Sequence, residues 1–276
     1  MSFNSVNTNR QAVFAMQSLN LTNSELGGVQ KRVSTGYRVA DARDDGGAFA
    51  VAQAVRSDVA GVTAVGEQLG GVKGVLQTTF AALSTVSDTM KQVRATLTRL
   101  ADGAINGDQR DQYEKQYELL TEQISDFIDD ATYNGRTLLS TATATGGNIT
   151  GIRNEGGGTF TIQAVDGETL KLSTTAPASA TAAQGMIASG GDFDDIDALI
   201  STQLNTFGAS MQYVENQITY NSKKVDAMND GLGALVDADL AKESSKLQAL
   251  QTRQQLGIQT LGIANQGPQV LLSLFR

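Results

Sequence analysis

The chain has 276 residues, a formal net charge of −8, and neither histidine nor cysteine. An acidic chain without clustered Lys and Arg argues against nucleic acid as a partner. Without His or Cys there is no Ser-His-Asp triad, no His-ligated metal and no thiolate chemistry. Only two prolines occur, so long helices can run without interruption.

The first 34 residues are predicted to form one helix that carries almost no charge. Within residues 1–30 the only charged side chains are Arg10 and Glu25. Apolar residues recur at helical spacing: Ala12, Met16, Leu19, Leu26, Val29 and Val33. The segment has no basic stretch followed by an apolar one, so we expect no secretory signal peptide and a signal-independent route for any export.

Residues 35–46 are predicted to connect this helix to the next one. Gly36 provides a helix stop, because glycine accepts the left-handed conformation in which many helices end. Asp44 or Asp45 is placed to cap the following helix by accepting from its free amides. A simple flexible linker is the alternative interpretation of this segment.

Residues 47–139 are predicted to form two antiparallel helices. From Val55 to Ala104 apolar residues repeat with an average spacing close to the coiled-coil value of about 3.5 residues. A helix of about 50 residues would be roughly 75 Å long. We expect Asn106-Gly107 to end it, Asp108 to cap the second helix and Asn134-Gly135 to stop that one.

Residues 140–192 are rich in Gly, Thr, Ser and Ala, and are predicted to hold a small, surface-facing β-hairpin. Asp166-Gly167 is a turn signal, and a three-residue loop that begins at Val165 would put Gly167 in the left-handed conformation. The register then forms two apolar pairs: Ile162 with Leu170, and Phe160 with Leu172. We expect deletion of residues 143–182 to leave assembly largely intact.

Helical periodicity returns in residues 193–233, loosens at Gly231 and Gly233, and continues in residues 234–276. The last segment carries no charge from Gln254 to Phe275, yet its glutamines interrupt the apolar run that a bilayer helix needs, so we expect no membrane insertion. Uncharged, amide-rich ends suit burial against other copies. The predicted fold is mainly α: a long antiparallel helical rod or coiled coil of the N- and C-terminal halves, with a small β-hairpin insertion in the middle.

Motifs for catalysis and ligand binding are missing from the sequence. The glycines at residues 70–74 lack the phosphate-loop spacing and lie inside a helical stripe. The four aspartates of residues 192–197 lack the glycine and glutamate of a calcium loop and fit an acidic first helical turn. We therefore expect a protein that is not an enzyme and that has no cofactor and no metal.

Short motifs at both ends of the chain resemble those of bacterial flagellins. The N-terminal motifs are Asn7-Thr8-Asn9, Ser34-Thr35-Gly36-Tyr37-Arg38-Val39 followed by Ala42, Asp44 and Asp45, Gln77-Thr78-Thr79 with Leu83, and Tyr133-Asn134-Gly135. The C-terminal motifs are Asp237-Ala238-Asp239, Glu243, Leu261, Ala264-Asn265-Gln266, Pro268-Gln269 and Leu272-Ser273-Leu274. They cover about residues 1–140 and 193–276 in the family's order, and the short middle is most similar to compact flagellins of the Caulobacter type.

The resemblance implies a structural subunit of the extracellular flagellar filament that polymerises with copies of itself or with paralogues. It also implies export through the flagellar type III apparatus with an export chaperone, and contact with filament cap and hook–filament junction proteins. The inner tube would be lined by Ala12, Met16, Leu19, Leu26, Val29, Val33, Leu247, Leu250, Ile258, Leu261, Ala264 and Leu272. Each terminal stripe is expected to lack a partner inside one subunit, so that the ends become ordered only in the filament.

Two further sets of residues follow from the resemblance. A fixed, subunit-contacting spoke would contain Ser34, Gly36, Arg38, Asp44 and Asp45. Candidate O-glycosylation sites, by similarity to modified flagellins, are Thr143, Thr145, Thr159, Thr174, Thr175 and Ser179. The chain departs from better-known relatives at residues 68–74, which replace an Asn-rich stretch, and at Gln92 and Gln116, where receptor-activating flagellins carry Arg and Glu.

One alternative lies within the same structural class as the filament subunit, and two other function classes compete with it. A hook–filament junction protein would share flagellin-like ends, with less complete motifs. A coiled-coil binding module such as an adhesin or chaperone has no reason to keep charge-free termini. An enzyme would need one of the catalytic constellations that this sequence lacks.

Overall fold

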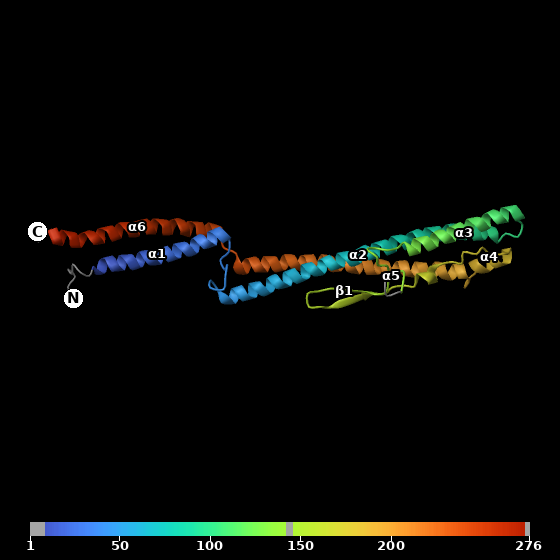
Figure 1. Cartoon of the computed structure of the whole chain (residues 1–276), viewed down its shortest axis with the longest axis horizontal. Coiled ribbons are helices and arrows are strands. Elements are labelled where there is room, and N and C mark those ends of the chain that lie inside the picture. Colours follow the sequence, from blue (N-terminus) through green and yellow to red (C-terminus); the bar gives the residue numbers. More distant parts are fainter. Residues whose placement is uncertain (1–8, 142–145, 274–276) are drawn as a thin grey trace. The chain divides into compact units, whose positions relative to one another are not determined.

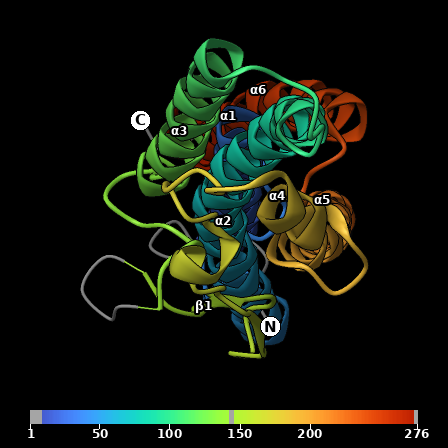
Figure 2. The same cartoon turned by 90° about the vertical axis from the view of Figure 1, so that its right-hand side faces the viewer.

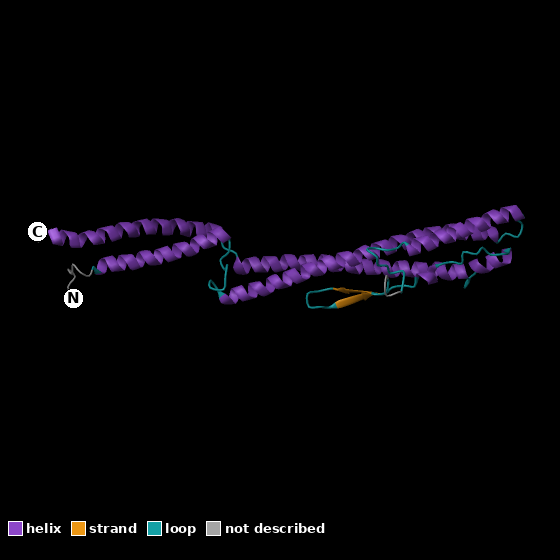
Figure 3. Cartoon of the chain, viewed as in Figure 1, coloured by secondary structure: helices purple, strands orange, loops and turns teal. Residues whose placement is uncertain are grey.

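A computed structural model describes residues 9–141 and 146–273 of the chain and confirms the mainly α fold with a small antiparallel sheet (Figure 3). In chain order the elements are α1 (Arg10–Thr35), α2 (Gly46–Leu100), α3 (Gly107–Asp129), β1 (Ile149–Ile152), β2 (Thr159–Ile162), the 3-10 helix η1 (Gly167–Leu170), α4 (Ala180–Ile187), α5 (Asp192–Val236) and α6 (Leu240–Ser273). The chain divides into two compact units, which we call the terminal unit (residues 1–57 and 227–276) and the central unit (residues 58–226).

The long helix α2 runs for 55 residues without a break. Its buried side chains recur every three, four or seven positions: Leu69, Leu76, Leu83, Val86, Met90, Val93, Leu97 and Leu100. The helix ends at Leu100, and the cap of α3 is Asn106 rather than the predicted Asp108. The Asn106 side-chain oxygen accepts from the Gln109 amide at 2.9 Å, while Asp108 lies in the first turn, where its charge complements the helix dipole.

In the central unit, α5 runs antiparallel to α2, as predicted for the two halves. Lys73 pairs with Glu215 at 2.9 Å, and Arg94 lies over the Phe193 ring at 5.1 Å, so residue numbers fall along one helix as they rise along the other. Helix α3 also lies alongside α2, with Arg99 over the Tyr113 ring at 5.4 Å (Figure 2). Large side chains from these helices fill a single core. They include Leu76, Met90, Tyr117, Ile124, Phe193 and Phe207.

The predicted hairpin around Asp166-Gly167 is wrong. Strand β2 pairs with β1, with Ile149 opposite Ile162 and Ile152 opposite Thr159. Asp166 instead caps η1 by accepting from the Glu168 amide at 3.2 Å. Gly167 has no left-handed conformation; its amide donates to the Leu139 carbonyl at 3.1 Å, and a Cβ there would come within 2.4 Å of that oxygen.

Leu170 and Leu172 explain why the local turn signal fails. Both are buried in the core shared by the helices of the central unit, where they lose more water contact than on a two-stranded sheet. The Tyr117 hydroxyl donates to the Ser173 carbonyl at 3.0 Å, and Arg110 donates to the Pro177 carbonyl at 2.8 Å. The prediction that residues 140–192 form only a surface appendage is therefore wrong, because part of this segment belongs to the core.

Two helix boundaries also differ from the prediction. Helix α3 ends at Asp129, and Asn134-Gly135 forms a tight turn with φ of 50° and 73° between the bridged residues Tyr133 and Arg136. The boundary predicted between residues 233 and 234 lies a few residues later in the structure, because α5 continues to Val236. Helix α6 starts afresh with Asp239, whose carboxylate accepts from the Lys242 amide at 3.1 Å.

Candidate assembly site

Helices α1 and α6 form an antiparallel pair inside the terminal unit (Figure 1). Leu26, Val29 and Leu250 are buried between them, with Val33 and Leu247 packed against this cluster. Two amide contacts follow the same register: Asn9 donates to the Ala264 carbonyl at 2.7 Å, and Gln254 donates to the Asn23 side chain at 2.7 Å. The uncharged amides thus cross-link the two helices without stranding a charge.

This pairing corrects the expectation that the terminal stripes have no partner inside one subunit. Of the predicted inner-tube residues, Leu26, Val29 and Leu250 are buried and Met16 and Ile258 are exposed. The half-buried ones are Ala12, Leu19, Val33, Leu247, Leu261 and Ala264. The side chain of Leu272 lies outside the described residues. Five residues of the predicted stripe, Leu26, Val29, Val33, Leu247 and Leu250, therefore pack together between the two terminal helices of the same chain.

A second apolar face on the pair was missed by the sequence analysis. Phe14, Leu21, Leu256 and Ile263 have exposed fractions of 64%, 68%, 56% and 69%. Phe14 and Leu21 are seven residues apart, as are Leu256 and Ile263, so each couple lies on one helix face. Because successive residues are about 100° apart around a helix, Phe14 and Leu21 lie well away from Leu26 on α1. In the same way Leu256 and Ile263 lie well away from Leu250 on α6. The seven-residue spacing was visible in the sequence and could have identified this face.

The connection between α1 and α2 is a folded loop. Gly36 ends α1 in the left-handed conformation, with φ of 74° and its amide donating to the Arg32 carbonyl at 2.9 Å. Asp45 accepts from the Ala48 amide at 3.0 Å and so caps α2. The predicted helix stop and one of the two predicted caps are therefore present.

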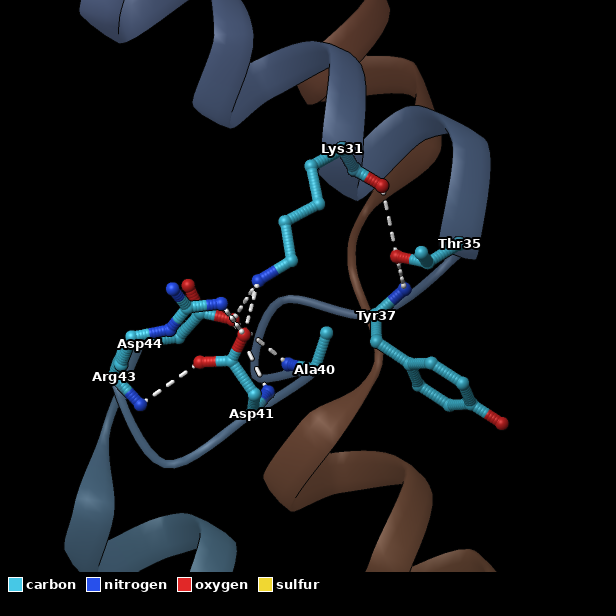
Figure 4. A network of polar contacts seen from close by, with 7 residues as sticks. All are labelled: Lys31, Thr35, Tyr37, Ala40, Asp41, Arg43 and Asp44. Atoms are coloured by element: carbon cyan, nitrogen blue, oxygen red, sulfur yellow. Dashed lines mark hydrogen bonds and ion pairs between the residues drawn. The ribbon is translucent and has the colours of Figure 1, made fainter.

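Asp44 has a different role from the predicted cap, because it closes the loop on itself (Figure 4). Its carboxylate accepts from the amides of Ala40 at 3.0 Å and Asp41 at 3.2 Å and from the Lys31 ammonium at 2.9 Å. Lys31 also donates to Asp41 at 2.9 Å. The Lys31 hydrogen bonds lower the pKa of both carboxyls, and the two carboxylates raise the pKa of Lys31.

The same loop is hydrogen-bonded to the break between α5 and α6. The amides of Arg38 and Val39 donate to the Val236 carbonyl at 2.7 and 3.2 Å, and the Ala238 amide donates to the Gly36 carbonyl at 2.9 Å. The Arg38 guanidinium donates to the Leu235 carbonyl at 2.5 Å. Of the predicted spoke residues, Gly36 and Arg38 thus bond to the break between α5 and α6, Asp44 and Asp45 bond within the loop and to the helices beside it, and Ser34 is exposed at the end of α1. Sequence reasoning missed Lys31 and Asp41, since their contact depends on the folded loop.

Arg32 and Glu243 add an ion pair between α1 and the first turn of α6, at 3.4 Å. The Glu243 side chain is mostly buried, and its second oxygen has no hydrogen-bond partner among the described residues. Lys31 and Arg32 therefore bind in two directions, one to the connecting loop and one to α6. Both cations stand near the C-terminal end of α1, where positive charge is favourable.

The candidate O-glycosylation residues differ in their surroundings. Thr159, Thr174 and Thr175 are exposed. Ser179 is exposed too, but its hydroxyl oxygen accepts from the Ala182 amide at 3.1 Å and caps α4. Thr143 and Thr145 lie outside the described residues.

Two other kinds of site are absent from the described part of the chain. No helix there combines the length and hydropathy that a bilayer crossing requires. Within the same residues no group of three or more Asp and Glu side chains is arranged to hold a metal ion.

Comparison with known proteins matches both halves of the helical fold. The model of the bacterial flagellin N-terminal helical region matches residues 6–144, and the model of the bacterial flagellin C-terminal helical region matches residues 193–275. Among solved structures, Bacillus cereus flagellin shows a TM-score of 0.36 at 20% identity, over 66% of this chain and 94% of that one. A putative flagellar hook-associated protein from Vibrio parahaemolyticus shows a TM-score of 0.41 at 14% identity, over 78% and 99%.

Curated relatives align along the full length. Flagellin FljK of Caulobacter vibrioides is 36% identical over 279 aligned residues, which include 100% of both chains. Flagellin FljM of the same organism is 34% identical with the same coverage, and a flagellin of Brucella melitensis is 33% identical over 99% of both chains. The chain therefore belongs to the bacterial flagellin family, on the side of the compact, Caulobacter-type members.

Proposed function

We propose that this structural subunit of the bacterial flagellar filament polymerises through the outward apolar face of its α1–α6 pair. The face consists of Phe14 and Leu21 on α1 and Leu256 and Ile263 on α6. The exposure of these four side chains carries the proposal, because large apolar side chains left exposed on one face of each helix are typical of a protein interaction site. The hook–filament junction alternative is not favoured, since both flagellin models match and full-length relatives are flagellins.

The polar surroundings of the face fit burial between subunits. Neither residues 11–24 nor residues 254–275 contain a charged side chain. A shallow hollow of about 400 Å³ beside Leu21 is lined by the amides of Gln17 and Asn20. Amides can exchange hydrogen bonds with those of another copy, whereas a buried unpaired charge would cost several kcal/mol per contact.

In this proposal the α1–α6 pair forms the inner layer of the filament, and the connecting loop at residues 36–45 holds its position. Secretion to the cell exterior through the flagellar export apparatus is supported by family membership. An export chaperone, the filament cap and the hook–filament junction would be its further protein partners on the same grounds. Self-assembly is the step that the exposed face explains directly.

Charge substitution on the outward face tests the proposal. Ile263→Asp should abolish polymerisation of purified subunits onto filament seeds, because every added copy would bury an unpaired carboxylate. Ile263→Val is the matched control, since it keeps an apolar side chain at the same position. Negative-stain microscopy and sedimentation measure the polymer, and far-ultraviolet circular dichroism shows that the central unit stays folded. Filaments of Ile263→Asp at the wild-type yield would overturn the role of this face.

A further inference from the structure

The central unit contains a half-enclosed hollow, which has no part in the contacts proposed for the α1–α6 pair. It measures about 310 Å³ and is lined mainly by Gln68, Gly71 and Val72 of α2, Tyr133 and Arg136 of the tight turn, and Thr150 of β1. All of these residues belong to the central unit. We call it the Arg136 socket.

Two glycines of α2 shape the socket in different ways. At Gly74 a Cβ would come within 2.7 Å of the Tyr133 ring, so the ring requires bare backbone there. At Gly71 a Cβ would meet nothing within 4 Å. A glycine inside a helix costs about 1 kcal/mol relative to alanine. Among the described residues no contact requires bare backbone at Gly71, so the glycine serves to leave the socket open on that side of α2.

The socket offers one positive charge and no negative one. Its lining contains Arg136 but neither Asp nor Glu. No carboxylate among the described residues pairs with the Arg136 guanidinium. The neighbouring cation of α2, Lys73, already binds Glu215 at 2.9 Å. Arg136 is therefore available to a carboxylate from outside the chain, and its planar fork binds a carboxylate through two parallel hydrogen bonds.

We propose that the Arg136 socket receives an Asp or Glu side chain from a second copy of this chain. This inference rests on the proposed polymerisation. Each copy has a net charge of −8, so a lattice of copies repels itself unless carboxylates of one copy meet cations of the next. The Arg136 side chain is exposed, so a carboxylate of another copy can reach it, and Val72 and Ile149 beside it offer apolar contact area.

Removal of the charge is the first test. Arg136→Gln should raise the critical concentration for polymerisation about tenfold, the effect of losing one hydrogen bond to a charged group. Arg136→Lys should raise it less, because an ammonium keeps the charge without the fork. A wild-type critical concentration for Arg136→Gln would overturn the socket. Failure of the unmodified chain to polymerise would instead contradict the proposed function.

Filling the space is the second test, and it has a matched control. Gly71→Leu places a side chain in the socket, while Gly70→Leu adds one on the next residue of α2, which is also open and does not line the socket. Gly71→Leu should raise the critical concentration about tenfold, and Gly70→Leu should change it less than about twofold. Equal values for the two variants would contradict the proposal.

Chemical cross-linking is the third test, and it identifies the carboxylate that binds in the socket. In Arg136→Lys filaments, a zero-length carbodiimide can join the introduced amine to a carboxylate in contact with it. Mass spectrometry of filaments grown from isotopically light and heavy subunits should find this amine linked to an Asp or Glu of another copy. Links found only within one copy would overturn the inference.

Discussion

The central unit and the α1–α6 pair distribute their apolar side chains in opposite ways. In the central unit Leu76, Met90, Tyr117, Phe193 and Phe207 are fully buried within one core. In the pair the cluster contains three buried side chains, those of Leu26, Val29 and Leu250. Large apolar side chains remain outside on both helices of the pair. The central unit thus buries a large apolar core within one copy, whereas the pair buries a small one and leaves more of its apolar side chains for other copies.

This difference separates folding from assembly. A two-helix pair with a small internal cluster is marginal by itself, since isolated helices have little stability in water. Burial of the outward face by neighbouring copies adds stabilisation in proportion to the apolar area removed from water. The α1–α6 pair should therefore depend on the polymer, while the central unit should not.

The largest expected effect appears when the same substitution, Phe to Ala, is made once in each region and the stability of the subunit is compared. Phe207→Ala empties part of the central core and should lower the free energy of unfolding of the subunit by about 3–5 kcal/mol. Phe14→Ala removes an exposed ring and should change it by less than about 0.5 kcal/mol, yet impair polymerisation. Thermal and denaturant unfolding of the free subunits, with a polymerisation assay beside them, would show this. Equal losses of subunit stability would erase the distinction.

The segment between β2 and α4 should behave as core. Leu170→Ala should lower the free energy of unfolding of the subunit by about 2–5 kcal/mol, because Leu170 is fully buried among the central helices. The exposed neighbour Thr169→Ala is the control and should have little effect. Deletion of residues 143–182 removes Leu170 and Leu172 together, so their burial reverses the expectation that this deletion is tolerated. A fully stable deletion variant would show that these leucines contribute little.

A substitution at Gly36, the one left-handed glycine of the connecting loop, should weaken polymerisation. Gly36→Ala forces a Cβ into φ of 74° and should cost about 1–2 kcal/mol, which raises the critical concentration about tenfold. Gly27→Ala in the same helix has open space around its Cβ and ordinary helical geometry, so it should not weaken the helix. Seeded growth at a series of subunit concentrations measures both. Identical critical concentrations would mean that the loop is only a tether.

A smaller effect is expected from acid. The lowered pKa values of Asp41 and Asp44 mean that the folded loop binds fewer protons than the unfolded chain. Its stabilisation is complete above the ordinary carboxyl pKa of about 3.9 and is lost as the pH falls through the lower, folded values. Hydrogen exchange of filament peptides from residues 36–45, corrected for intrinsic rates, should therefore increase below about pH 4. Lys31→Gln should already show part of that increase at pH 7, and an unchanged pattern would refute the Lys31 contacts.

The sequence predicted the long helices well because their signals are local and repeated. Apolar spacing near 3.5 residues marked α2, and Gly36 and Asp45 marked a helix end and a helix start. These features depend on residues a few positions apart, which is the range over which capping and helical periodicity act. The family motifs at both ends then indicated the function.

The sequence did not reveal which partner covers an apolar surface. Asp166-Gly167 is a strong hairpin signal, but burial of Leu170 and Leu172 against distant helices outweighs it. Likewise the terminal stripes gave no sign of whether Leu250 packs against α1 of the same chain or against another copy. A periodic pattern fixes the apolar face of a helix, and tertiary contact decides what that face meets.

Hydrogen exchange of the same chain as free subunit and as filament tests the central claim most directly. Peptides from residues 58–226 should be protected in both states, since their core is complete within one copy. Peptides from α1 and α6 that contain Phe14, Leu21, Leu256 or Ile263 should exchange rapidly in the free subunit and slowly in the filament. Equal protection of these helices in both states would contradict the claim that the α1–α6 pair depends on other copies.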